Sequence, residues 1–133
     1  MPDLSQGKVP SLDTLKALFD RFASWKLNHV ELYLEHTFAY ARHEPVWRDA
    51  SPYTAEELRE LDDHAHALGI ELTAQQNCLG HMERWLAHET YRALSISPDG
   101  FTTPWGEQRV PWTADPALPA TPALRRDLFG DLD

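Results

Sequence analysis

The chain has 133 residues, of which 42% are hydrophobic and 25% charged, and both values are typical of one soluble globular domain. Its 21 acidic and 12 basic residues give a net charge of −9, which disfavours a nucleic-acid partner. No apolar run reaches the roughly 20 residues of a membrane span, no signal peptide opens the chain, and the lone Cys78 excludes an intramolecular disulfide. We therefore expect a cytoplasmic protein that binds neither nucleic acid nor membrane.

The first predicted helix begins after Pro10, with Ser11 as its N-cap. The short segment before this helix, Met1–Ser5, is expected to form the end of a first strand. The apolar residues of the helix recur at helical spacing and predict one buried face. They are Leu12, Leu15, Leu18, Phe19, Phe22 and Trp25.

Alternating apolar and polar residues predict a strand over Val30–Glu35, which ends in the polar pair Glu35 and His36. After a polar loop over residues 41–52, Thr54 and Glu57 form a capping box that opens a second helix. Gly69 supplies the left-handed residue that ends this helix. The next strand is predicted over Ile70–Gln76.

The strand predicted over Ile70–Gln76 also ends in polar side chains, and the segment around its end is the most informative of the chain. Gln76 and Asn77 precede a turn at Gly80, and His81 then opens a helix that contains Trp85. In α/β folds, ligands bind where the carboxyl ends of the strands meet the following loops. The alternative is a turn whose amides only cap the backbone.

Residues 95–119 form a predicted long, irregular loop rich in proline and glycine, which contains Trp105 and Trp112. A last helix begins at Thr121 and Pro122 and is expected to face Leu124, Leu128, Phe129 and Leu132 inward. Tryptophans in loops either plug the fold or offer flat rings to sugars, whose hydroxyl groups bind amide, imidazole and carboxylate partners. The composition therefore leans towards a carbohydrate ligand.

The order of strands and helices predicts an α/β fold, βαβαβα, with parallel strands. A (β/α)₈ TIM barrel needs roughly 250 residues, so residues 1–133 are expected to be the amino-terminal part of one barrel domain. Such a partial barrel is expected to leave strand edges and an apolar inner face uncovered, which predicts self-association.

Neither a metal nor a cofactor is expected. His64 and His66 lack the spacing of a zinc helix, and His81-Met82-Glu83 lacks the Cys-x-x-Cys of zinc deaminases. Cys78 stands close to His81, but a buried structural cysteine is the simpler interpretation than a thiol nucleophile.

Four blocks occur in order: DLSQGKVPSLDTLK, KLNHVELYLEHTFAY, WRDASPYTAEELRELDDHAHALGIEL and QNCLGHMERWL. Together they resemble glycoside hydrolase family 20, the β-N-acetylhexosaminidases, over essentially the whole chain. The resemblance implies a (β/α)₈ barrel that hydrolyses terminal N-acetylhexosamine by a retaining mechanism in which the substrate's own acetamido oxygen attacks the anomeric carbon.

The resemblance also implies which residues bind the N-acetylhexosamine-containing carbohydrate. His81 matches the family's histidine after the third strand, Glu35 and His36 match the end of the second strand, and Asp3 matches an acidic residue near the end of the first. The remaining expected contacts are Gln76, Asn77 and Trp85.

The family's catalytic pair, an acetamido-orienting Asp followed by the acid Glu, has no match in this chain. Its adjacent acidic pairs, Glu56-Glu57 and Asp62-Asp63, both lie in a predicted helix. The chain alone is therefore expected to be inactive, with the pair beyond its last residue. The alternatives are a non-catalytic carbohydrate-binding or interaction module, and an unrelated small α/β protein that associates through its sheet edges.

Overall fold

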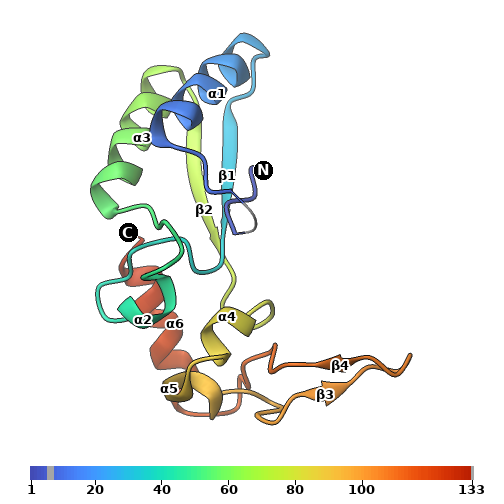
Figure 1. Cartoon of the computed structure of the whole chain (residues 1–133). Coiled ribbons are helices and arrows are strands. Elements are labelled where there is room, and N and C mark those ends of the chain that lie inside the picture. Colours follow the sequence, from blue (N-terminus) through green and yellow to red (C-terminus); the bar gives the residue numbers. More distant parts are fainter. Residues whose placement is uncertain (6–7, 133) are drawn as a thin grey trace.

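The computed structural model describes residues 1–5 and 8–132. Gln6 and Gly7 of the first sequence block, and Asp133 of the predicted domain, lie outside the described residues. Two strands, β1 (His29–Leu34) and β2 (Glu71–Gln76), pair in parallel with Val30 opposite Leu72 and Leu34 opposite Gln76. Helices α1 (Leu12–Ser24) and α3 (Ala55–Ala67) lie side by side along the sheet (Figure 1). The predicted α/β class and the parallel pairing are confirmed.

The predicted first strand is present only as a single parallel bridge between Asp3 and Tyr33. Its backbone hydrogen bonds run from Leu4 N to Tyr33 O at 3.1 Å and from Tyr33 N to Pro2 O at 3.0 Å. The bridge places Asp3 beside the carboxyl-terminal half of β1.

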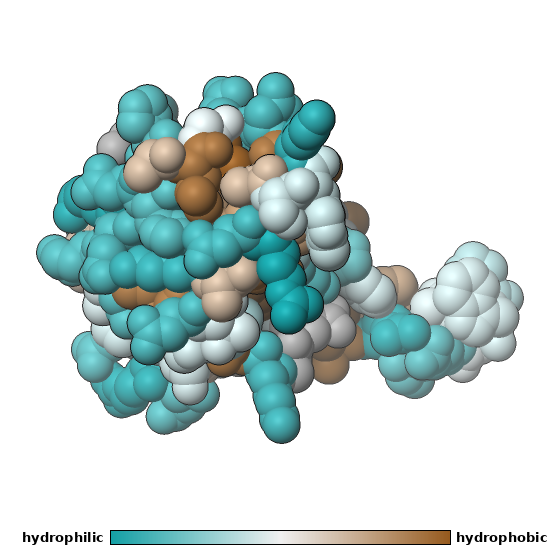
Figure 2. Space-filling model, turned by 90° about the horizontal axis from the view of Figure 1, so that it is seen from above, coloured by the Kyte–Doolittle hydropathy of each residue, from teal (hydrophilic) through white to brown (hydrophobic). Residues whose placement is uncertain are grey.

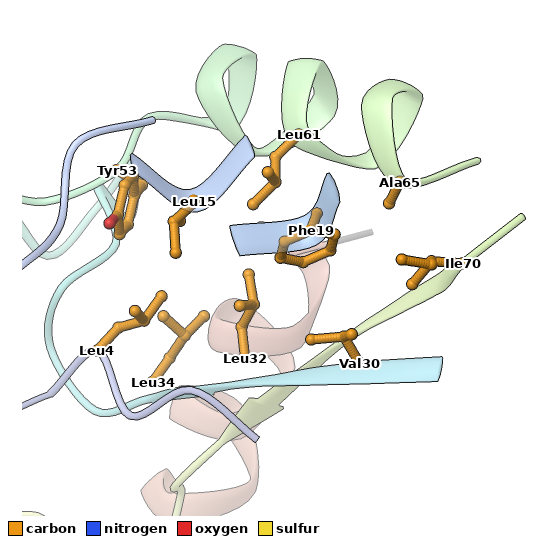
Figure 3. Close-up of a cluster of buried hydrophobic side chains, with 10 residues drawn as sticks. All are labelled: Leu4, Leu15, Phe19, Val30, Leu32, Leu34, Tyr53, Leu61, Ala65 and Ile70. Carbon is orange, nitrogen blue, oxygen red and sulfur yellow. The ribbon is translucent and has the colours of Figure 1, made fainter. Parts of the chain in front are cut away.

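The core between the helices and the sheet follows from the two periodicities in the sequence. Every second residue of β1 points towards the helices, while the helices present residues at three- and four-residue spacing. Figure 3 shows these side chains converging: Leu15 and Phe19 from α1, Leu61 and Ala65 from α3, and Val30, Leu32 and Leu34 from β1. Leu4, Tyr53 and Ile70 complete this cluster.

The predicted caps of α1 and α3 are confirmed, whereas the helix predicted to open at His81 begins at Glu83 and the last helix begins at Ala120. Ser11 Oγ accepts a hydrogen bond from Thr14 N at 3.3 Å, and the capping box joins Glu57 N to Thr54 Oγ1 at 3.2 Å and Thr54 N to Glu57 Oε2 at 2.8 Å. Gly69 has φ +72°, as the left-handed end of a helix requires.

Two residues expected to face inward are exposed. Trp25 is 64% exposed because α1 ends at Ser24, so this side chain no longer follows the helical stripe. Phe129 is also exposed, since it lies about 100° around α6 (Ala120–Gly130) from the buried Leu128 and about 140° from the buried Leu124.

The segment predicted to be irregular contains a hairpin. Strands β3 (Phe101–Thr102) and β4 (Gln108–Arg109) pair antiparallel, and Thr103 N donates to Glu107 O at 2.8 Å. The hairpin projects from the rest of the molecule (Figure 1). Seen from above, it forms a separate lobe, and the surface in this view is largely hydrophilic (Figure 2). Strands of two residues are too short to produce an alternating pattern in the sequence.

Three single-turn helices complete the fold: α2 (Glu44–Trp47), α4 (Glu83–Leu86) and α5 (Glu89–Arg92). With α6 they bury a second core at the carboxyl end of the sheet, made of Phe38, Tyr40, Val46, Met82, Trp85, Leu86, Tyr91, Leu124 and Leu128. This core supports the loops that follow β1 and β2.

The sheet face opposite the helices is polar, which corrects the expected apolar inner face. The residues that alternate with the core side chains are Glu31 and Tyr33 on β1 and Thr73 and Gln75 on β2. His29 and Thr73 hydrogen bond across the strands at 3.1 Å on this face. The inward positions of these strands therefore carry hydrogen-bonding groups rather than a second apolar layer.

Candidate functional site

The carboxyl ends of β1 and β2 bring together polar side chains that are far apart in the sequence. Because the strands are parallel and in register, Glu35 and Asn77 follow neighbouring positions at one edge of the sheet. We call the residues Asp3, Tyr33, Glu35, Asn77 and His81 the Glu35 cluster.

The centre of this cluster is the carboxylate of Glu35, which is only 2% exposed. Tyr33 OH donates to Glu35 Oε1 at 2.9 Å, and Asn77 Nδ2 donates to the same tyrosine oxygen. His81 Nδ1 lies 3.9 Å from Glu35 Oε1. A chain of polar groups thus runs from Asn77 through Tyr33 to Glu35 and on to His81.

Burial raises the pKa of the Glu35 carboxyl above its ordinary value, and the charges of Glu83 and Asp3 act in the same direction. The hydrogen bond from Tyr33 and the charge of His81 oppose this change. Burial and the hydrogen bond to Glu35 likewise raise the pKa of Tyr33 to about 12. Tyr33 therefore remains a hydroxyl donor at neutral pH.

The backbone of Glu35 is held by two side chains. Trp85 Nε1 donates to Glu35 O at 2.7 Å, and Gln76 Nε2 donates to the same oxygen at 3.1 Å. Gln76 also donates to Asn77 O at 2.6 Å and accepts from Tyr40 OH. Trp85 and Gln76, both expected to contact a ligand, are buried in the structure and position Glu35.

His81 forms the open side of the cluster, with a half-exposed side chain. Its φ of +54° is unusual for a residue other than glycine and turns the chain between the end of β2 and α4. The ring meets Trp112 edge to face at 5.4 Å between centroids, and Arg109 lies 5.3 Å above the same indole. Hydrogen bonds from Met82 N to Trp112 O (2.9 Å) and from Ala114 N to Leu79 O (2.8 Å) hold this loop in place.

Two residues at this site, Tyr33 and Arg109, were not predicted from the sequence. Tyr33 lies two residues before Glu35 on the same face of the strand, and the period of two could have identified it. Arg109 carried no signal, because a contact between the hairpin and Trp112 depends on the tertiary path of the loop. Trp112 was recognised only as one of several loop tryptophans.

Asp3 lies at the edge of the cluster. Its Oδ1 accepts hydrogen bonds from Ser5 N at 2.9 Å and Ser5 Oγ at 2.6 Å, and its backbone bridges Tyr33. His36, by contrast, lines a separate pocket with Ser5 and Arg84. The structure therefore brings Asp3, Glu35, Asn77 and His81 together and directs His36 elsewhere.

The cluster is suited to binding a polar, uncharged ligand. It offers amide, hydroxyl, imidazole and carboxyl groups beside an aromatic ring, the combination that recognises the hydroxyl groups and C–H faces of sugars. Within residues 1–5 and 8–132, no three histidine, cysteine, aspartate or glutamate side chains gather in a way that could hold a metal ion. In the same part of the chain, no helix has the length and apolar character needed to cross a membrane.

In sequence, the chain matches no protein-family model and none of the curated proteins. In structure, it is similar to the Streptomyces plicatus N-acetyl-beta-hexosaminidase in complex with Thio-NAglucal, with a TM-score of 0.76 and 20% identity over 98% of this chain. A glycoside hydrolase family 20 beta-N-acetylglucosaminidase superimposes with a TM-score of 0.74 and 20% identity, again over 98% of this chain.

A third similar structure is the family 20 exo beta-N-acetylglucosaminidase from Vibrio harveyi in complex with N-acetylglucosamine, with a TM-score of 0.71 and 17% identity over 92% of this chain. The chain spans only 28%, 32% and 23% of the lengths of these three proteins, respectively. The chain therefore has the fold of a part of the family 20 β-N-acetylhexosaminidases.

Proposed function

We propose that this chain forms the amino-terminal part of a family 20 (β/α)₈ barrel and contributes to a site that binds a terminal N-acetylhexosamine. The observation that supports this most is the Glu35 cluster, which lies at the carboxyl end of parallel strands, where barrel enzymes bind their substrates. The similar Streptomyces plicatus structures contain Thio-NAglucal or N-acetylglucosamine, and the Vibrio harveyi structure contains N-acetylglucosamine.

In this proposal the residues in and around the Glu35 cluster have separate roles. His81 and Asn77 hydrogen bond to hydroxyl groups of the sugar, and Trp112 packs against one face of the ring. Glu35 fixes the orientation of His81. Its buried carboxyl faces Nδ1 of the imidazole and favours the tautomer in which this nitrogen carries the proton. Trp85 and Gln76 contribute indirectly, through the backbone of Glu35.

The proposed reaction is retaining hydrolysis assisted by the substrate's acetamido group, the scheme that distinguishes this family from enzymes with two carboxylates. No Asp-Glu dipeptide occurs in the 133 residues. The acid and the acetamido-orienting Asp are therefore supplied by residues outside this sequence, and the chain by itself binds without hydrolysing.

Binding is tested by saturation-transfer NMR of the chain with N-acetylglucosamine. We expect a saturable signal that is weakened by Asn77→Ala and by His81→Ala. Matched controls are Asn28→Ala and His66→Ala, which change exposed residues at the opposite end of the sheet. Equal effects of the site and control variants would contradict the proposed site.

Hydrolysis is tested with a chromogenic N-acetylglucosaminide. The loss of general acid catalysis typically costs about 10²–10⁴-fold in rate, so we expect no measurable turnover from the chain alone. Turnover that disappears in His81→Ala would show that the chain supplies its own acid. Glu35→Gln would then be the next variant, since burial raises the pKa of this carboxyl.

A further inference from the structure

A second polar pocket lies beside the Glu35 cluster, on the other side of the turn that follows β1. We call it the His36 pocket. It has a volume of about 660 Å³. Residues from four parts of the chain line it: the segment before α1, the turn after β1, α2 with the residues that follow it, and α4 with the residues that follow it. Its polar lining includes Ser5, Lys8, His36, Thr37, Arg84 and His88.

Two buried groups in this lining have no hydrogen-bond partner among the described residues. His36 is 9% exposed and Thr37 is 2% exposed, and neither His36 Nδ1 nor Thr37 Oγ1 is hydrogen bonded. Native proteins pair nearly all of their buried polar groups, because leaving one unpaired is costly. Both atoms are enclosed by protein, so they lie behind the wall of the pocket, and only a movement of that wall would bring a ligand within hydrogen-bond distance of them.

The charges around the pocket indicate the sign of that ligand. Although the chain as a whole carries a charge of −9, the pocket is lined by Lys8 and Arg84 and by only one carboxylate, that of Asp49. Glu83 precedes Arg84 in the chain and acts on the charge of His36 from outside the lining. Guanidinium and ammonium groups beside neutral hydroxyl and imidazole donors form the combination that proteins use for oxyanions.

We propose that the His36 pocket binds an oxyanion, a sulfate or phosphate group, either as the free ion or as an ester carried by a sugar. Arg84 donates in a bidentate manner to two of its oxygens, and Lys8 supplies a second charge at the rim. The site is distinct from the Glu35 cluster and does not depend on the hexosaminidase assignment.

The test is isothermal titration calorimetry of the full chain with sodium sulfate and sodium phosphate, against sodium chloride at the same ionic strength. We expect saturable binding of an oxyanion, about tenfold weaker in Arg84→Gln, as for the loss of a hydrogen bond to a charged group. Arg92→Gln is the matched control, since Arg92 is an exposed arginine on the neighbouring helix α5 and lies outside the pocket. Asp49→Asn should strengthen binding, because it removes the negative charge from the lining.

The source of the oxyanion is distinguished by titrating N-acetylglucosamine 6-sulfate and 6-phosphate in parallel. Binding of an ester that is tighter than that of both the free ion and unsubstituted N-acetylglucosamine, and that is weakened by Arg84→Gln, assigns the pocket to a substituted glycan. An ester that binds no more tightly than the free ion assigns the pocket to the free ion. Unsubstituted N-acetylglucosamine reports on the Glu35 cluster alone, so failure of one site is separable from failure of the other. The inference is overturned if no oxyanion binds, if Arg84→Gln and Arg92→Gln behave alike, or if Asp49→Asn weakens binding.

Discussion

At the scale of single residues, the side chains that hold Glu35 are as informative as Glu35 itself. Trp85 is fully buried, and its indole N–H donates to the carbonyl oxygen of Glu35 at 2.7 Å. The same ring meets Tyr40 edge to face at 5.4 Å and His43 at 5.3 Å. The aromatic core beneath the site therefore determines the position of the carboxyl group above it.

Trp85→Phe should destabilise the chain. The phenyl ring fills most of the space but cannot donate, so Glu35 O loses one buried hydrogen bond, at a cost of about 1–3 kcal/mol. Urea unfolding followed by circular dichroism measures this change. Trp105→Phe is the control, since Trp105 is 76% exposed at the tip of the hairpin and should change the free energy of unfolding very little.

A second residue-scale prediction concerns pH. Burial lowers the pKa of His43, although the charge of Asp127 acts in the opposite direction; burial and the charge of Arg84 lower the pKa of His36. Between the folded pKa of each histidine and the unfolded value of about 6.5, the unfolded chain binds more protons than the folded chain. The contribution of these two histidines to the free energy of unfolding should therefore fall as the pH decreases below about 6.5.

The variant that tests this is His43→Gln, in which the amide retains a partner for Tyr91 OH, now 2.7 Å from His43 Nδ1. Its midpoint of thermal unfolding should depend less steeply on pH between 5 and 7 than that of the wild type. The exposed His66→Gln is the control and should leave the slope unchanged. Identical slopes for all three proteins would contradict the account of His43.

At the scale of secondary-structure elements, the joint between α3 and β2 depends on one backbone conformation. Gly69 has φ +72°, and a Cβ added there would meet no atom within 4 Å. Substitution should therefore act through backbone strain and not through a clash.

Gly69→Ala should lower the free energy of unfolding by about 1–2 kcal/mol, the cost of the left-handed conformation for a residue with a side chain. Gly80→Ala is the matched control, because that position is equally open and does not have a positive φ. Chemical denaturation of both variants measures the difference. A loss of equal size in the two variants would show that the φ angle is not the cause.

At the scale of the whole molecule, the two faces of the sheet differ in what they leave uncovered. The face opposite α1 and α3 carries polar side chains, whereas a small groove with apolar and charged lining residues lies on the helical side of β2. Leu72 and Ala74 line this groove together with Phe38, Leu58 and Leu132, and the charged Arg59, Asp62 and Asp131 also line it. Of the two faces of the sheet, the helical side of β2 therefore offers the more apolar surface for association.

We expect purified chain to form dimers or larger species in light scattering, because β2 pairs with β1 alone among the described strands and its other edge is open. Ala74→Lys should reduce the association by placing a charge among the apolar side chains of this groove. Thr73→Lys, on the polar face of the same strand, is the control and should have a smaller effect. A monomer at high concentration would contradict this expectation.

The sequence by itself determined the features that depend on local periodicity and capping. The apolar stripes of α1 and α3, the alternation in β1, the capping residues Ser11 and Thr54 and the turn at Gly69 are all encoded within a few neighbouring residues, and the parallel α/β class follows from their order. The same reasoning located Glu35, Asn77 and His81, because parallel strands bring their carboxyl ends to one edge.

Only the tertiary structure decided how these ends are arranged. It buried Trp85 and Gln76 beneath Glu35, turned His36 into a different pocket, and brought Trp112 and Arg109 back from the hairpin to His81. It also showed that the uncovered face of the sheet is polar. These outcomes depend on packing between segments far apart in the chain, and no local pattern encodes which side of a turn a side chain will face.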